Sequence, residues 1–208
     1  MRDKKSGRLG RPRSFDVDTA LEVGQRLFHE RGYDGVSLAD LTHALGIAAP
    51  SFYAAFGSKA AFFQKILDRH ASAALPVDDF LIEGHSIAGA IEDFLVARAV
   101  TYSAHARAKG CLVLDATHNC SDPGASSAAE QIAEIGRLRM RDLIARSRPD
   151  LSEPISDLVT SIMHGLSALA RQGWSTDRLV AAARNAALSV RTMAESTKLG
   201  APVGGTTA

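Results

Sequence analysis

Apolar residues recur every three or four positions along most of this 208-residue chain, and glycine, proline or capping residues divide the pattern into segments. Such spacing predicts amphipathic helices. Most segments are long, but residues 37–59 contain two short ones, SLADLTHALG and AAPSFYAAFGSK. In the first, Leu38, Leu41 and Leu45 share one helical face, and Gly46 is the expected left-handed residue at its end. The pattern predicts two short helices joined by a sharp turn.

Start signals support both helices. Ser37 is a capping residue, and Asp40, three residues later, suits the positive end of the helix dipole. Pro50 falls in the first turn of the second helix, where a missing N–H costs nothing. Phe52 and Phe56 are four residues apart and are expected to face inward. Two such helices form a helix-turn-helix, whose second helix enters the major groove of DNA.

The other segments predict an all-α fold with about nine helices. Asp16 is expected to cap the first helix, and Ser58 the helix that begins at Lys59. A loop is expected at residues 76–84, and a break at residues 121–124. Besides the two short helices and a short apolar segment at 109–119, the expected helices span residues 16–31, 59–74, 87–106, 125–148, 153–172 and 176–196.

The composition is that of a globular protein. Apolar residues make up 46% and charged residues 23% of the chain, which is ordinary for soluble domains. No stretch approaches the roughly 18 apolar residues of a membrane span, and the start lacks the apolar core of a signal peptide. We therefore expect a cytoplasmic protein whose two cysteines are thiols. Phosphate-binding loops, dinucleotide fingerprints and nucleophile elbows are absent from the sequence, so no enzymatic activity is expected.

The first 14 residues form a basic, flexible arm, although the net charge of the chain is only +1. Against the single acid Asp3, residues 1–13 carry Arg2, Lys4, Lys5, Arg8, Arg11 and Arg13. Such an arm can follow DNA phosphates or reach into the minor groove. The alternative is a disordered, solubilising tail. Its position before a helix-turn-helix favours contact with DNA, and Arg11 and Arg13 are the candidates.

The segment from residue 15 to about residue 67 resembles the N-terminal DNA-binding domain of the TetR/AcrR family of transcriptional regulators. The matching motifs are RLFHERGYDGVSL, the LGI turn and PSFYAAFGSK. The resemblance implies a three-helix DNA-binding domain at 15–60 and a helical ligand-binding and dimerisation domain at 61–198, with a disordered tail at 199–208. It also implies a repressor without a cofactor that binds a double-stranded DNA operator as a homodimer and responds to an unknown small-molecule effector.

The same resemblance places Lys59 at the start of a helix, where its ammonium and the exposed N–H groups can meet a phosphate. Tyr53 projects from the recognition helix, and Ser37 either donates to phosphate or only caps its helix. Residues 48 and 49 are both alanine, where the family commonly offers a capping hydroxyl and a basic residue. Base readout is therefore expected to depend on DNA shape and on short side chains. The candidates for DNA contact, besides the arm, are Ser37, Ala49, Ser51, Tyr53, Ala54 and Lys59.

The middle helices should enclose an effector pocket if the family pattern holds. Cys111 lies in a GCL stretch that resembles one found in TetR-like regulators, some of which respond to electrophiles or oxidants. The thiol is an inert packing group, a sensor or a metal ligand, although the histidines and cysteines here have no recognised metal-ligand spacing. The candidate effector-binding residues are Phe94, Tyr102, Cys111, Leu114, His118, Met140, Met163 and Trp174.

The last two helices are the expected dimer interface. One apolar stripe runs through Ile155, Leu158, Val159, Ile162, Leu166 and Leu169, and another through Leu179, Val180, Ala183, Ala187, Val190 and Met193 or Ala194. Small residues on the first helix, Ser161, Gly165 and Ala168, would permit close approach. The alternative is that both stripes are core of the monomer.

Two functions remain open at this point. The first is a DNA-binding regulator, for which the absence of an acidic activation segment favours repression over activation. The second is a helical module that senses a small molecule, an oxidant or an electrophile through Cys111, with weak or no specific DNA binding.

Overall fold

The structure, a computed structural model, describes residues 16–73, 76–80 and 84–196. Within these ranges it contains nine α-helices, two 3-10 helices and no strand, which confirms the all-α prediction. The elements in chain order are α1 (Val17–Arg31), α2 (Leu38–Leu45), α3 (Ala49–Phe56), α4 (Lys59–Ala73), η1 (Val77–Phe80), α5 (Ile87–Ser103), α6 (Leu112–Ala116), α7 (Pro123–Ala145), η2 (Pro149–Leu151), α8 (Ser152–Arg171) and α9 (Thr176–Ser196).

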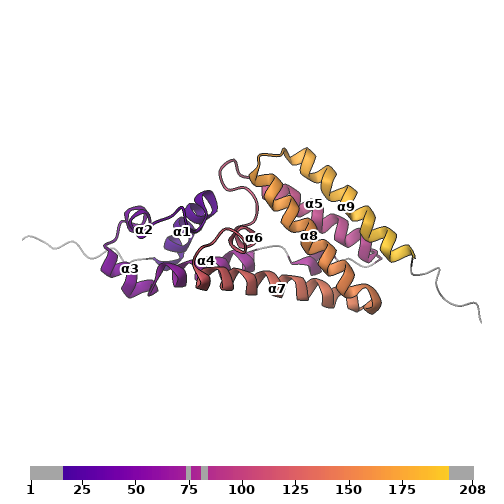
Figure 1. Cartoon of the computed structure of the whole chain (residues 1–208), viewed down its shortest axis with the longest axis horizontal. Coiled ribbons are helices and arrows are strands. Elements are labelled where there is room, and N and C mark those ends of the chain that lie inside the picture. The colour runs from indigo at the N-terminus through magenta and orange to yellow at the C-terminus, as the bar shows by residue number, and fades with distance from the viewer. Residues whose placement is uncertain (1–15, 74–75, 81–83, 197–208) are drawn as a thin grey trace, which may run out of the picture.

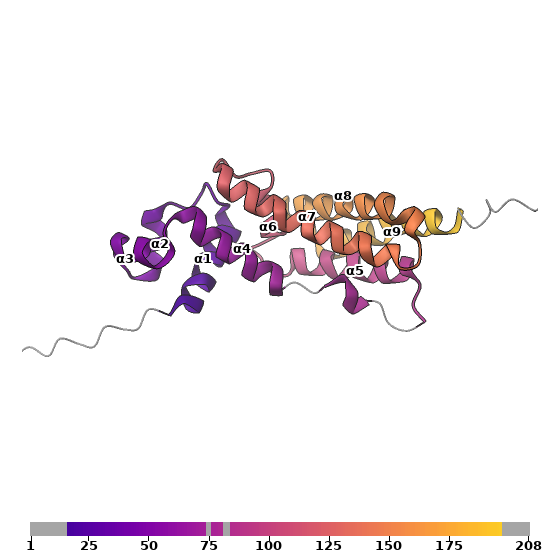
Figure 2. The same ribbon diagram turned by 90° about the horizontal axis from the view of Figure 1, so that it is seen from below.

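The described part of the molecule is elongated, with the helix-turn-helix pair α2 and α3 at one end (Figures 1 and 2). Helices α1, α2 and α3 form that end, while α5, α8 and α9 pack together at the other. Helix α4 leads away from the first group, and α7 lies against both α4 and α8. The two helices α4 and α7 therefore join the halves of the molecule.

The predicted helix-turn-helix is confirmed in its local geometry. The Ser37 hydroxyl accepts the backbone N–H of Asp40 at 3.1 Å, and the Asp40 carboxylate accepts the N–H of Ser37 at 2.8 Å, which completes a capping box. Gly46 ends α2 in the left-handed region, with φ 65° and ψ 31°. Pro50 lies in the first turn of α3. Asp16 and Ser58 cap α1 and α4, as predicted.

Aromatic residues fix α3 against the helices beside it. Phe52 and Phe56 of α3 are buried, and Phe56 lies 4.4 Å from Phe62 between ring centroids. Phe28 of α1 meets Phe63 edge-on at 4.8 Å. The hydrophobic core around these rings extends past residue 60, because it also contains apolar residues of α4, α6 and α7: Phe62, Phe63, Ile66, Leu67, Leu112, Val113, Ala116, Ala125, Ala128 and Ala129.

A second hydrophobic core fills the other half and uses much of the two stripes predicted for the dimer interface. On α9, Leu179, Ala183, Ala187 and Val190 are at most 2% exposed. On α8 the stripe divides: Ile155, Val159 and Leu166 are buried in the monomer, whereas Leu158, Ile162 and Leu169 are half-buried. Most of the α9 stripe and half of the α8 stripe therefore pack inside the monomer, as the alternative interpretation predicts.

Several predicted boundaries differ from the structure, and α7 ends at Ala145 rather than at residue 148. Helix α5 ends at Ser103 rather than near residue 106, because the chain turns back until the N–H of Gly110 bonds the carbonyl of Tyr102 at 2.8 Å. The predicted break at residues 121–124 is confirmed up to residue 122, but α7 begins at Pro123 rather than near residue 125, with Asp122 as its cap and proline in its first turn. The predicted loop at 76–84 contains the 3-10 helix η1.

The close approach of α1 and α4 gives a test of this packing. A Cβ atom at Gly24 of α1 would lie 2.5 Å from the Phe62 ring and 2.7 Å from Ile66. Gly24→Val should therefore lower the free energy of unfolding by about 1–3 kcal/mol, measured by urea denaturation. Gly136→Ala is the control, since a Cβ there meets nothing and should raise stability by about 0.5–1 kcal/mol. An unchanged stability of Gly24→Val would contradict the packing.

Candidate nucleic-acid interface

Helix α3 presents a neutral face with one large side chain. Tyr53 is 51% exposed, and Ser51 and Ala54 are also exposed, whereas Ala49 is half-buried. The helix carries no cation. The arm candidates Arg11 and Arg13 lie outside the described residues. Base contacts from α3 are thus limited to hydroxyl groups, the phenol and methyl groups.

Ser37 is already engaged in its own helix. Its hydroxyl donates to the Asp40 carboxylate at 2.5 Å and accepts the N–H of Asp40. Asp40 also lies 3.5 Å from Arg31. The hydrogen bonds from Ser37 keep the pKa of the Asp40 carboxyl below its usual value. The capping role of Ser37 accounts for its position at the exposed start of α2.

Lys59 begins α4, where Ser58 caps the helix by accepting the N–H of Ala61 at 3.0 Å. The ammonium does not extend freely into solvent. Its Nζ lies 3.9 Å from the centroid of the Tyr33 ring, and the side chain is half-buried. Burial lowers the pKa of Lys59, while the carboxylates of Asp34 and Asp122 act in the opposite direction.

The segment between α6 and α7 is hydrogen-bonded to the turn between α1 and α2. The Tyr33 hydroxyl donates to Asp122 at 3.2 Å. Asp34 accepts both the backbone N–H and the hydroxyl of Ser121, at 2.8 and 2.7 Å. We call these four residues the loop contact. It joins residues 87 to 89 positions apart in the sequence, so no local pattern could reveal it.

Two half-buried histidines form a second junction between the halves. His29 of α1 lies 3.1 Å from the carbonyl of Gly110, and its ring meets that of His70 of α4 edge-on at 5.7 Å. His70 lies 3.8 Å from the Cys111 sulfur. Burial lowers the pKa of both histidines, that of His70 to about 4. Both rings are therefore neutral at pH 7.

Cys111 occupies the N-cap position of the five-residue helix α6, without a side-chain capping hydrogen bond, and packs into this junction. Its backbone N–H donates to the Ser167 hydroxyl at 2.9 Å. Burial raises the pKa of its thiol, although backbone N–H groups of α6 partly oppose the shift. The pKa of Cys120 is raised as well, again mainly by burial. Among the described residues, no three histidine, cysteine or carboxylate side chains lie together as a metal site would require.

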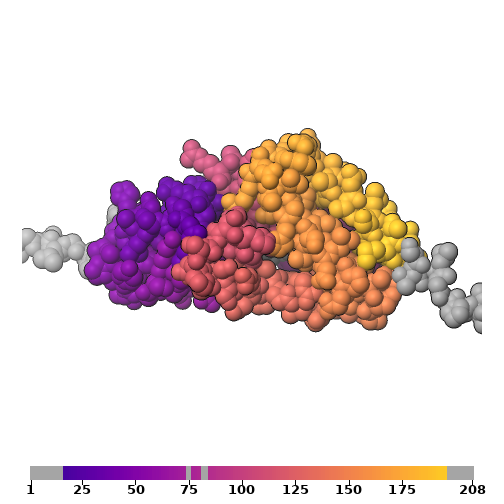
Figure 3. All heavy atoms as spheres, in the orientation of Figure 1, coloured from indigo at the N-terminus to yellow at the C-terminus, as the bar shows by residue number. Residues whose placement is uncertain are grey.

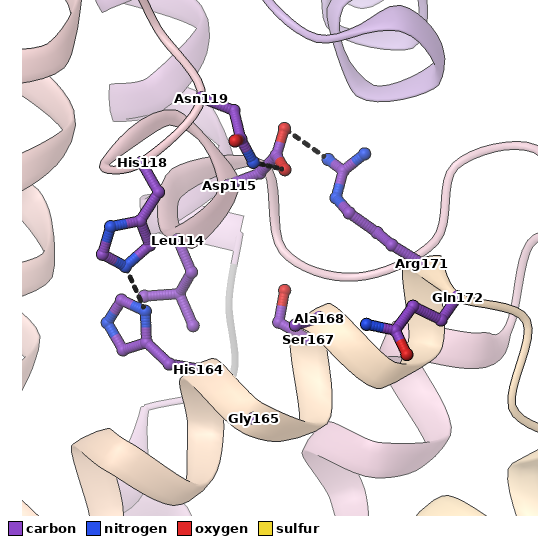
Figure 4. A pocket seen from close by; sticks show the side chains of 10 residues that line it. All are labelled: Leu114, Asp115, His118, Asn119, His164, Gly165, Ser167, Ala168, Arg171 and Gln172. Atoms are coloured by element: carbon purple, nitrogen blue, oxygen red, sulfur yellow. Dashed lines mark hydrogen bonds and ion pairs between the residues drawn. The ribbon is translucent and has the colours of Figure 1, made fainter.

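A cavity of about 520 Å³ lies between α6 and α8 (Figure 4). In it His118 Nε2 faces His164 Nδ1 at 3.2 Å, and Arg171 pairs with Asp115 at 3.0 Å. Figure 3 shows the surface hollowed where α8 passes the segment that contains α6 and the start of α7. Sequence reasoning included His118 but missed its partner His164 and the Asp115–Arg171 pair beside it.

Of the other effector candidates, only Leu114 also lines this cavity. Phe94, Tyr102 and Met140 are 3–5% exposed within the second hydrophobic core. Met163 and Trp174 pack against that core, and Arg178 covers the Trp174 ring at 3.6 Å. The described structure therefore does not gather the candidates around one cavity.

Comparison with known proteins places the chain in a family. Residues 20–66 match the model of the bacterial regulatory proteins, tetR family. The HTH-type transcriptional repressor BdcR of Escherichia coli K12 is 37% identical over 194 residues, which cover 92% of this chain and 98% of BdcR. The chain belongs to the TetR family. It is a DNA-binding transcriptional regulator of the TetR type, and the family acts as dimers that bind small-molecule effectors.

Two further TetR-type proteins resemble the chain along most of its length. The repressor ComR of the same organism is 29% identical over 82% of this chain and 87% of its own. The TetR-family regulator CifR, solved as a cysteine mutant complexed with a 26-base-pair operator duplex, matches with a TM-score of 0.69 and 30% identity. That match covers 86% of this chain and 99% of CifR. No helix in the described ranges has both the length and the apolarity needed to cross a bilayer.

The histidine junction predicts a loss of stability in acid. The unfolded chain binds a proton at His70 near pH 6.5, whereas the folded protein resists this until about pH 4. Neutral His70 therefore makes its full contribution to the free energy of unfolding above pH 6.5. That contribution falls by about 2 kcal/mol between pH 6.5 and pH 5. His70→Gln should flatten this decline in denaturant unfolding measured across the pH range. His43→Gln, at an exposed position, is the control, and equal slopes for wild type and His70→Gln would contradict the prediction.

Proposed function

We propose that this chain is a transcriptional repressor that binds an operator as a homodimer and leaves it when an effector binds to the second half of the molecule. The observation that carries the proposal is the α2–α3 pair, in which Ser37 caps α2, buried aromatic rings hold α3, and Tyr53 is exposed. The relative named as a repressor aligns over almost the whole chain, and CifR is described with operator DNA on the same fold.

We assign the same roles to the segments of the chain as the sequence predicts. Residues 15–60 bind DNA, with Ser51, Tyr53 and the methyl groups of α3 against base edges and Lys59 against a phosphate. The arm at 1–14 adds phosphate or minor-groove contacts. Residues 61–198 provide the effector site and the dimer interface. The protein acts in the cytoplasm and catalyses no reaction.

Exposed small and apolar residues on α8 and α9 support dimerisation through these two helices. Ser161, Gly165 and Ala168 lie exposed on α8, and a Cβ at Gly165 would meet nothing in the monomer. On α9, Leu188 is 54% exposed. A dimer built on these faces would hold two recognition helices for half-sites roughly 34–36 Å apart.

Repression and release are linked through the two conformations of such a dimer. An effector that binds the DNA-free arrangement more tightly must weaken operator binding by the same factor by which the operator weakens effector binding. The alternative of a sensor without specific DNA binding has no observation in its favour, since the DNA-binding half is intact and burial raises the pKa of both thiols.

The phosphate role of Lys59 has a direct test. Lys59→Gln should weaken binding to the duplex that the wild-type protein selects from a random pool. Because each released cation contributes about 0.9 to the slope of log affinity against log salt, the slope of a dimer should fall by about 1.8. Arg146→Gln, an equal charge change at the far end of α7, should leave the slope unchanged. Fluorescence anisotropy across salt concentrations measures both, and an unchanged slope for Lys59→Gln would refute the role.

The proposed dimer face has a matched pair of variants. Leu188→Glu would bury a charge in the dimer but leaves it in water in the monomer, so the variant should sediment as a folded monomer at micromolar concentration. Ile135→Glu introduces the same charge at a 51% exposed position on α7 and should remain dimeric. Wild-type protein of monomeric mass, or a dimeric Leu188→Glu, would exclude this face as the interface.

A further inference from the structure

Lys59, which we propose binds a DNA phosphate, contacts other residues of its own chain in the free protein. The ammonium of Lys59 lies 3.9 Å from the centroid of the Tyr33 ring, and the negative charges of Asp34 and Asp122 in the loop contact favour its charged form. Tyr33 is 5% exposed, so the ring is a fixed surface rather than a mobile partner. Lys59 therefore has an internal site in the free protein.

Part of this internal site belongs to the second half of the molecule. Asp122 is the cap of α7, where one carboxylate oxygen accepts the N–H groups of Gly124 and Ala125 at 2.9 and 3.0 Å. Its other oxygen accepts the Tyr33 hydroxyl. The start of α7 thus places the Asp122 charge and, through the Tyr33 hydroxyl, helps to position the ring that Lys59 contacts.

We propose that the loop contact restrains Lys59 in the free protein and that Asp122 and Tyr33 are positioning residues for DNA binding. This inference rests on the proposed phosphate role of Lys59. A phosphate must either draw the ammonium away from the ring or share it with two carboxylates, and each course costs free energy. The position of the start of α7 then changes the affinity of Lys59 for a DNA phosphate, and α4 need not move.

Asp122→Asn is the decisive variant. Asparagine still caps a helix, but it removes the charge beside Lys59 and the acceptor of the Tyr33 hydroxyl. Affinity for the wild-type-selected duplex should rise by about two- to fivefold for each half-site, the upper part of the range that corresponds to an exposed charge–charge interaction. Glu130→Gln removes the same charge from the same helix, at an exposed position, and should change affinity less. Equal gains in the two variants would show a general charge effect and overturn the inference.

A double-mutant cycle shows whether the gain passes through Lys59. In a Lys59→Gln background, Asp122→Asn should have no effect on affinity beyond that of Glu130→Gln. A gain that persists in that background would overturn the inference while leaving the phosphate role intact. If Lys59→Gln alone does not weaken binding, the proposed phosphate role itself fails, so the two failures can be distinguished.

Tyr33→Phe supplies a second, independent variant. It keeps the ring beneath Lys59 and the packing of Tyr33 against Phe28 and Phe63, whose centroids lie 5.8 and 4.9 Å away, but removes the hydroxyl that reaches Asp122. It removes only the hydrogen bond that positions the ring and leaves the charge of Asp122 in place, so it should raise affinity in the same direction as Asp122→Asn but by less. Weaker binding by either folded variant would mean that the loop contact prepares Lys59 for phosphate, the opposite of the proposal.

Discussion

The burial of aromatic rings between α1, α3 and α4 is the constraint on which the rest of the structure depends. Helix α3 has only eight residues and no side-chain cap, too few to be stable alone in water. Phe52 and Phe56 anchor it by packing into a core that also contains Phe28 and Phe62. Because these rings fix one face of α3, the rest of its surface points outward, and that surface carries Tyr53.

The same core extends beyond the DNA-binding helices, which changes how the two halves communicate. From the sequence, α4 is the only covalent link from residues 15–60 to the rest, and movement of this helix is the natural route for an effector signal. The structure adds two non-covalent links, the loop contact and the histidine junction at Gly110. Either link lets the second half act on α1 directly.

Local patterns predicted the elements well and the long-range contacts poorly. Ser37, Gly46 and Pro50 each act on their own helix, so the ends of α2 and α3 could be predicted from the sequence. The end of α5 could not, because it depends on Gly110 and the packing of the chain that returns to it. For the same reason, sequence reasoning found Lys59 but missed Tyr33 and Asp122, which approach it only in the folded chain. Effector candidates chosen as aromatic and methionine residues mostly proved to be core, since these side chains serve packing and binding equally well.

The central claim is that the outer face of α3 enters the major groove in two copies related by a two-fold axis. Hydroxyl-radical footprinting on the duplex selected by the wild-type protein tests it most directly. The account predicts two protected segments related by dyad symmetry, with their centres about one helical turn apart or a multiple of it, and loss of both in Tyr53→Ala. A single protected segment, or protection that Tyr53→Ala leaves unchanged, would contradict it.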